Sequence, residues 1–252
     1  EMKARQSHRT EFNDLSSDDD AVIQTPIEND DFLNMNVNTK TVRETTKKSN
    51  PIQNQDYVTY SVKRTPKRSV HGKSYIFSLI KEGKPVLFSK SNSRHPKGVL
   101  PISTNSDVHI RKSSSSEYTI TAENGCTKFI FKSSNQNPIL TYSISPSQNE
   151  YVKLPHLNIA VDESFDFSPK QMTSKRPQMS KRGFFFLDFH NKFTLPSEKN
   201  AIFIPANPEI GKDDLFVVRK IEKDRIEIDV NINAEDIIVF AIGLSTFLAK
   251  YN

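Results

Sequence analysis

The stretch AEDIIVFAIGLSTFLAKYN, residues 234–252, decides the fold. Over 237–249 it is apolar on every side, interrupted only mildly by Gly243, Ser245 and Thr246. A surface helix has one apolar stripe, whereas a helix that is apolar all round is buried in protein or in lipid. At about 1.5 Å per residue the run reaches only about 20 Å, too short for the roughly 30 Å hydrocarbon core of a bilayer. We therefore expect the rest of the protein to enclose this helix, and a lipid-inserted tail is the alternative.

The flanks of this run also favour a helix. Asn233 is a good N-cap residue, and Glu235 and Asp236 fall in the expected first turn, where the helix dipole favours negative charge. Lys250 lies at the opposite end. The sequence therefore predicts one well-defined helix close to the C-terminus.

The residues before 233 contain many short segments that are typical of β-strands. Each is β-branched or aromatic, is bounded by Pro, Asn, Asp, Ser or Gly, and lacks a helical period. Glu82-Gly83 and Asn124-Gly125 are hairpin signals between such segments. The expected strands lie within 57–62, 74–89, 117–133, 138–145, 157–164, 183–193, 200–206 and 214–232. We expect 163–182 to be a flexible loop.

Many evenly spaced strands with no interleaved helices favour an antiparallel all-β fold. A closed barrel of about twelve strands is wide enough to hold one helix along its axis, whereas an eight-stranded barrel is filled by its own side chains. The sequence therefore predicts a mainly β protein, a closed antiparallel barrel of about twelve strands around a central hydrophobic C-terminal α-helix.

The 252 residues divide into two parts by composition. Residues 1–56 are polar and aperiodic, which predicts a disordered N-terminal arm, and 57–252 form the barrel domain. Within the arm, 18–37 mixes acidic and apolar residues like a segment that folds on a protein partner. A single cysteine, Cys126, excludes a disulfide framework, and no signal peptide or membrane-spanning run is visible. We therefore expect a cytoplasmic protein that is soluble or peripheral to a membrane.

The formal charge of +5 is unevenly distributed. Residues 57–112 carry 12 basic and 2 acidic residues, so nearly all of the positive excess lies there. Such asymmetry favours a polyanionic partner, either nucleic acid or an anionic membrane surface.

Several stretches of the chain resemble the tubby-like family. They are LDFHNKF (187–193), SEKNA (197–201) and FAIGLSTF (240–247), which agree in order and spacing with the C-terminal end of that family's domain. TITAENG (119–125) is similar to a hairpin of the same family. The resemblance implies a twelve-stranded barrel around an apolar C-terminal helix.

The resemblance also implies a function and a site. Members of the family bind phosphoinositide headgroups, chiefly PI(4,5)P2, and act as membrane-tethered adaptors, several of them in ciliary traffic, with divergent N-terminal tails that supply the protein partner. The matching cations here are Lys90, Arg94 and Lys97 within SKSNSRHPKG (89–98), and Arg111 upstream of the 119–125 hairpin, with His95 as a further contact. The resemblance makes His190 a structural residue that is hydrogen-bonded inside the barrel.

The sequence also allows other interpretations of its function. Asp188 and His190 lie two apart on an expected strand and would share a face, but no nucleophile accompanies them, and neither the histidines nor Cys126 have metal-ligand spacing. We therefore expect no enzyme activity, no cofactor and no metal. A second basic cluster, Arg64 to Arg68 within SVKRTPKRSV (61–70), suits a membrane-facing rim, a nuclear-localisation patch or phosphorylation at Thr65 or Ser69. A nucleic-acid-binding, transcription-linked protein of the nucleus and a scramblase-type barrel are the alternative functions.

Overall fold

The computed structural model describes residues 57–69, 72–107, 116–135, 137–146, 155–180, 185–211 and 213–251. The arm expected over 1–56 lies outside these described residues. The strands are β1 (Val58–Ser69), β2 (Gly72–Lys81), β3 (Lys84–Ser91), β4 (Gly98–Ser103), β5 (Tyr118–Glu123), β6 (Lys128–Ser133), β7 (Pro138–Ser145), β8 (His156–Val161), β9 (Gln171–Ser174), β10 (Gln178–Met179), β11 (Phe185–Phe186), β12 (Ala201–Pro205), β13 (Phe216–Glu222) and β14 (Arg225–Val230). The helix is α1 (Asp236–Leu248).

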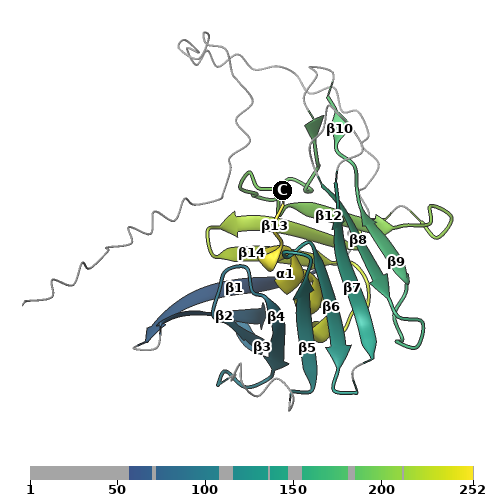
Figure 1. Cartoon of the computed structure of the whole chain (residues 1–252). Coiled ribbons are helices and arrows are strands. Elements are labelled where there is room, and N and C mark those ends of the chain that lie inside the picture. Colours follow the sequence, from purple (N-terminus) through teal and green to yellow (C-terminus); the bar gives the residue numbers. More distant parts are fainter. Residues whose placement is uncertain are drawn as a thin grey trace, which may run out of the picture.

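Twelve of these strands close into one antiparallel barrel (Figure 1). Their order around the barrel is β1-β14-β13-β12-β9-β8-β7-β6-β5-β4-β3-β2, and each strand is antiparallel to both neighbours. β10 and β11 form a separate two-stranded sheet that projects from the barrel. The predicted fold class is therefore confirmed.

Side chains along the barrel strands alternate between buried and more exposed positions. Along β2 the side chains of Tyr75, Phe77 and Leu79 are buried, and the residues between them are more exposed. This period of two places one set of side chains in the core and the other on the outer surface. The hairpin at Glu82-Gly83 has positive φ at both residues, 50° and 76°, which is the backbone that a tight two-residue turn requires.

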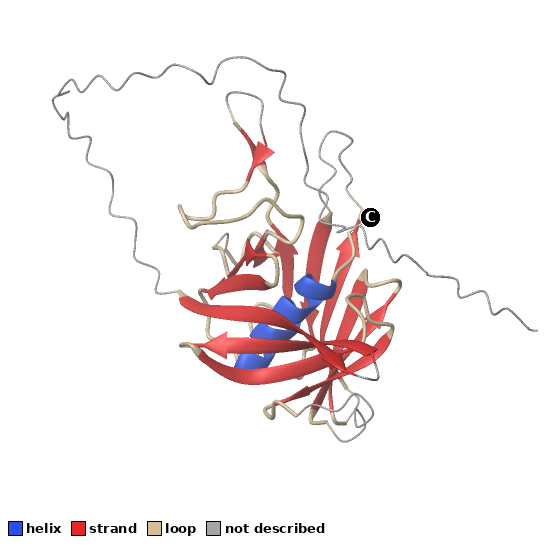
Figure 2. Cartoon of the chain, turned by 90° about the vertical axis from the view of Figure 1, so that its left-hand side faces the viewer, coloured by secondary structure: helices blue, strands red, loops and turns tan. Residues whose placement is uncertain are grey.

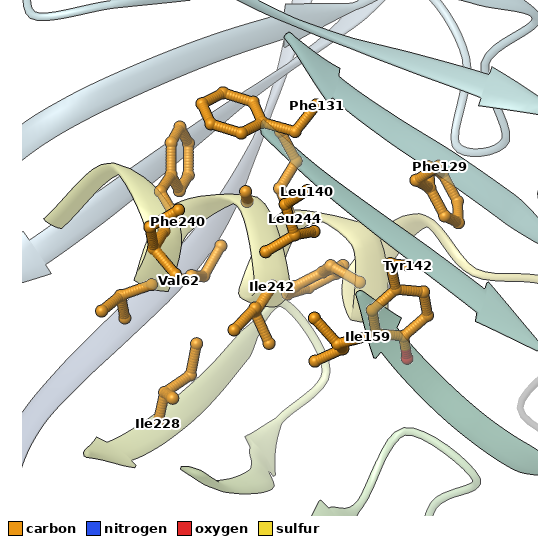
Figure 3. Packing of buried hydrophobic residues seen from close by; sticks show 14 of the residues in the cluster. Val62, Phe129, Phe131, Leu140, Tyr142, Ile159, Ile228, Phe240, Ile242 and Leu244 are labelled. Atoms are coloured by element: carbon orange, nitrogen blue, oxygen red, sulfur yellow. The ribbon is translucent and has the colours of Figure 1, made fainter. Parts of the chain in front are cut away.

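Helix α1 fills the interior of the barrel (Figure 2). Every residue from Ile237 to Leu248 is buried. The helix contacts β1 and β14 on one side and β3 and β7 elsewhere around the wall, so strands surround it. Figure 3 shows its side chains among those of the wall, with Phe240, Ile242 and Leu244 close to strand residues. The opening prediction of an enclosed helix is confirmed.

Gly243 lets the helix approach the wall closely. A Cβ atom at this position would lie 2.5 Å from Cδ1 of Ile228 and 2.7 Å from Cγ2 of Val62. Both distances are shorter than van der Waals contact allows, so only a residue without a side chain fits the present packing. The helix is thereby held against β1 and β14.

The two ends of the helix have different partners from those predicted. The N-cap residue is Glu235, not Asn233, and it makes no side-chain capping bond. Asp236 in the first turn accepts hydrogen bonds of 2.9 Å from Tyr60 Oη and from Lys81 Nζ. At the C-terminal end the ammonium of Lys199 donates to the carbonyl oxygens of residues 246, 247 and 249, at 2.9 to 3.4 Å. A lysine distant in sequence thus satisfies carbonyls that the last turn leaves unpaired.

Three expectations about strands were wrong or incomplete. Within the described part of the expected strand 183–193, only Phe185–Phe186 is a strand; 187–193 is irregular and turns at His190 and Asn191, whose φ values are 56° and 60°. The expected loop 163–182 contains a barrel strand, β9. β4 was not predicted, because Pro101 interrupts a strand-like pattern that is only six residues long.

Candidate functional site

The outer surface of β1 and β3 carries a group of lysines. Val62 points into the core with no exposed surface, so its neighbour Lys63 points outward, and Lys67 follows on the same face. Lys90 points outward from β3, because Ser89 and Ser91 on either side of it are buried. We call the outer surface formed by Lys63, Lys67, Lys90 and the β2 residues between them the basic face.

The strand register places these lysines around one small patch. Thr65 of β1 lies opposite Ile76 of β2, which lies opposite Lys90 of β3. Lys63 and Lys67 flank Thr65 two residues away on each side, on the same face. Neighbouring strands are about 4.8 Å apart, so the backbones of Thr65 and Lys90 are separated by roughly 10 Å.

Acidic residues are absent from these strands. None of β1, β2, β3 and β4 contains an aspartate or glutamate. Within the described part of the chain, no ion pair involves Lys63, Lys67 or Lys90. The basic face therefore presents uncompensated positive charge, which attracts polyanions.

The β3–β4 connection extends this charge to the end of the barrel. This connection follows the end of β3, where Lys90 lies, and it carries the half-buried Arg94 and the exposed Lys97. His95 Nδ1 lies 3.1 Å from the carbonyl oxygen of Leu248, and Cys126 Sγ donates to the carbonyl of Pro96 at 3.3 Å. The connection is thus fixed to the C-terminal end of the helix, and the imidazole of His95 contributes to that anchoring.

Three of the four predicted cations lie within the described residues. Lys90, Arg94 and Lys97 belong to one strand end and the connection that follows it. Arg111 lies outside the described residues. The residues that flank its connection, Ser103 of β4 and Tyr118 of β5, are at the opposite end of the barrel, because consecutive antiparallel strands connect at alternate ends. The role of Arg111 stays a prediction.

The side chains of the segment KRTPKR (63–68), which contains the second basic cluster, point alternately to the two faces of β1. Arg64 faces the interior: its Nε donates to Asp224 Oδ1 at 2.7 Å, and its guanidinium lies 4.9 Å from the ring centroid of Phe247. Lys63 and Lys67 face outward, and Arg68 pairs with Lys73 near the tip of the hairpin. Sequence reasoning did not include Lys63 and Lys67 in the site. The alternation that starts at the apolar Val62 was the signal that could have identified them.

On a different outer surface, across β13, β14 and β1, Arg219 and Lys192 are paired with acids. Arg219 is buried and donates to Asp229 Oδ2 at 3.1 Å, to Glu227 Oε2 at 2.9 Å and to the carbonyl of Phe193 at 2.8 Å. Lys192 reaches Asp229 Oδ1 at 2.9 Å, and Thr59 donates to the same oxygen at 2.6 Å. We call these groups the covered cluster, because residues 192–193 lie over it. It attaches the irregular segment after residue 187 to the outside of the barrel.

The ionisation of Asp229 reflects this pairing. Burial raises the pKa of Asp229, but the hydrogen bonds from Lys192 and Thr59 and the charge of Arg219 outweigh burial. The pKa of this carboxyl therefore lies below its ordinary value. The covered cluster therefore favours the ionised form of the Asp229 carboxyl.

His190 does not lie inside the barrel as expected. It is exposed in a turn, where its Nε2 contacts Asp214 Oδ2 at 3.1 Å, and Lys175 Nζ reaches Asp214 Oδ1 at 2.9 Å. Asp188 is not its strand neighbour but accepts a hydrogen bond from the backbone N–H of His190. The acid–histidine pair of the sequence is therefore a turn contact, and the carboxylate that faces the imidazole comes from a different segment.

Two kinds of feature are absent from the described residues. Among them there is no group of three or more His, Cys, Asp and Glu side chains that could hold a metal ion. None of their helices has the length and apolarity needed to cross a membrane.

No protein-family model matches this chain, and no curated protein matches it in sequence.

Proposed function

We propose that the barrel binds the headgroup of a phosphoinositide of the PI(4,5)P2 type at an anionic membrane surface. The observation that supports this is the basic face, in which Lys63, Lys67 and Lys90 project from strands that contain no acidic residue. Arg94 and Lys97 follow on the adjoining connection. Several cations fixed on neighbouring strands suit a headgroup with several phosphates, because lysine offers a compact charge and arginine a bidentate fork.

The wider surroundings of the basic face suit a membrane surface. Arg68 and Lys73 near the hairpin tip are exposed, and the tip extends past the last pair between β1 and β14. Each basic residue near an anionic leaflet adds about 1 kcal/mol of attraction. A specific headgroup contact and a general electrostatic attraction would therefore act on the same side of the protein.

The protein would act as a non-enzymatic, membrane-tethered adaptor on the cytoplasmic side. This part of the proposal rests on the resemblance of 187–193, 197–201 and 240–247 to the tubby-like family and on the composition of residues 1–56. The barrel would supply the membrane contact, and the N-terminal arm would bind the protein partner. A role in ciliary or vesicular trafficking follows from the same resemblance.

Liposome co-sedimentation of the full chain tests the proposal. The experiment compares three kinds of vesicle: neutral phosphatidylcholine, phosphatidylcholine with phosphatidylserine, and phosphatidylcholine with PI(4,5)P2. The two anionic kinds have the same total charge. We expect binding to increase from the first to the third. Equal binding to neutral and PI(4,5)P2 vesicles would contradict the proposal.

A DNA competitor separates the membrane from nucleic acid. If the basic face is a phosphoinositide site, soluble PI(4,5)P2 headgroup displaces the protein from vesicles at lower phosphate concentration than duplex or single-stranded DNA. Preferential displacement by DNA would favour the nucleic-acid-binding alternative.

A further inference from the structure

We propose that Thr65 is a phosphorylation site for a proline-directed protein kinase, and that phosphorylation there weakens the binding of the basic face to anionic membranes. The inference rests on the proposed function and adds regulation to the same site. The acceptor segment is Thr65-Pro66-Lys67-Arg68, in which proline follows the threonine directly and a basic residue stands three positions after it. Proline-directed kinases of the cyclin-dependent class select acceptors with both features.

Thr65 is distinguished from the other threonines and serines that precede a proline. These are Thr25, Ser145 and Ser168, and the residues three positions after them are Glu28, Gln148 and Gln171. Ser168 is exposed, but the proline after it is buried, whereas Thr65 and Pro66 are both exposed. Thr65 therefore combines the complete acceptor pattern with an accessible position.

The backbone around Thr65 is also accessible. β14 pairs with β1 only as far as Lys63, and the last backbone bond at this edge runs from Arg64 N–H to the carbonyl of Asp224 at 2.8 Å. Pro66 faces the same edge as Arg64, since backbone groups two residues apart point the same way in a strand. Proline has no N–H to leave unpaired there, and it discourages a further strand from adding. The acceptor segment is thus an extended strand with one open edge.

The reaction itself needs only ATP and the kinase. Thr65 Oγ1 attacks the γ-phosphorus of Mg-ATP, the bond from that phosphorus to the β-phosphate oxygen breaks, and ADP leaves. The hydroxyl proton passes to the catalytic aspartate of the kinase. Within the described residues the Thr65 hydroxyl makes no side-chain hydrogen bond that would have to be broken first.

A phosphate on Thr65 would act directly on the basic face. It brings about −1.5 to −2 charges to position 65. Lys63 and Lys67 flank this position on the same strand, and Lys90 lies level with it on β3, beyond β2. The three lysines would then pair with the phosphate and lose most of their attraction for headgroups. We expect the affinity for PI(4,5)P2 vesicles to fall about ten- to thirtyfold.

The experiment treats the full chain with a cyclin-dependent kinase and Mg-ATP, and maps phosphate by mass spectrometry. The wild type, Thr65→Val and Ser168→Ala are compared, since valine keeps the β-branched shape of threonine. We expect phosphate at Thr65 in the wild type and in Ser168→Ala, followed by the loss of vesicle affinity in both. Thr65→Val should bind PI(4,5)P2 vesicles alike before and after kinase treatment.

Two results would overturn the inference in different ways. If the kinase leaves Thr65 unmodified in the folded protein, or if the phosphoprotein binds PI(4,5)P2 vesicles like the untreated protein, the switch is wrong and the proposed function stands. If the untreated protein shows no preference for PI(4,5)P2 over neutral vesicles, the proposed function fails and the switch fails with it.

Discussion

Two outer surfaces of the barrel meet on β1, and they use their cations in opposite ways. In the covered cluster, Arg219 and Lys192 are paired with Asp229 and Glu227, and segment 192–193 lies over them. On the basic face, a few residues further along β1, Lys63 and Lys67 have no acidic partner among the described residues.

Burial determines which of these charges need a partner. A buried cation needs its acidic partners because desolvation penalises an unpaired charge. An exposed cation without a partner contributes little to stability and keeps its full charge for a ligand. The covered cluster should therefore control the stability of the barrel, and the basic face should control binding.

The largest effect is expected from breaking the covered cluster. Arg219→Met removes the cation that contacts Asp229, Glu227 and the carbonyl of Phe193, and leaves two acids without it. We expect a loss of about 3–5 kcal/mol in the free energy of unfolding, as for other buried pairs that lose one partner. Urea denaturation checks this, with Lys90→Met as the matched control. Equal stability of Arg219→Met and wild type would contradict the structural role of the cluster.

Acid should weaken the same cluster. The pKa of Asp229 in the folded protein lies below its ordinary value of 3.8, so the ionised form is favoured by folding. Its contribution to stability is present above the unfolded pKa and is lost as pH falls through the folded pKa. The free energy of unfolding is measured at pH 7 and in steps below pH 4. It should decrease more steeply with falling pH for wild type than for Asp229→Asn. Parallel curves for the two proteins would show that Asp229 does not carry this dependence.

The interior gives an intermediate effect that is independent of charge. Gly243→Ala should destabilise the protein by about 1–3 kcal/mol through overpacking against Val62 and Ile228, although alanine favours an isolated helix by about 1 kcal/mol. Ser245→Ala is the control in the same helix, since it removes a buried hydroxyl that has no hydrogen-bond partner in the described structure. Thermal denaturation compares them. Stabilisation by Gly243→Ala would mean that the helix is packed more loosely than described.

The smallest effect on stability is expected on the basic face. Lys90→Ala should change the free energy of unfolding by less than about 0.5 kcal/mol, because the side chain has no buried partner. It should weaken PI(4,5)P2 vesicle binding about fivefold, which corresponds to roughly 1 kcal/mol. Lys84→Ala is the control, since Lys84 is exposed at the other end of the same strand, about 20 Å away. Equal effects of the two variants on binding would argue against a localised site.

Much of the fold could be predicted because its signals are local. The apolar run of α1 and the turns at Glu82-Gly83 and Asn124-Gly125 identify the helix and two hairpins without any tertiary information. β9 was missed because Gln171–Ser174 is short and has one apolar residue, Met172, so its pattern is too brief to show a period. The segment 187–193 looks like a strand in sequence, but its attachment through Arg219 to the carbonyl of Phe193 depends on residues far along the chain.

The site was only partly predictable for the same reason. The positive excess in 57–112 located the basic face, on which Lys90 lies, and Arg94 and Lys97 follow on the adjoining β3–β4 connection. Which cations are paired could not be read from the sequence, because the partner of Arg64 is Asp224, on the distant β13–β14 turn. Lys199 likewise reaches helix carbonyls almost fifty residues away, with no local signal.

The proposed function requires that the lysines of the basic face bind the membrane and that lysines elsewhere on the barrel do not. The most direct test is co-sedimentation with PI(4,5)P2 vesicles of the triple variant Lys63→Ala, Lys67→Ala, Lys90→Ala. Its control is Lys84→Ala, Lys128→Ala, Lys132→Ala, which removes the same charge from exposed and partly exposed positions elsewhere. We predict that the triple variant loses at least tenfold in affinity at unchanged melting temperature and that the control binds nearly like wild type. Equal losses in both, or none in either, would contradict the claim.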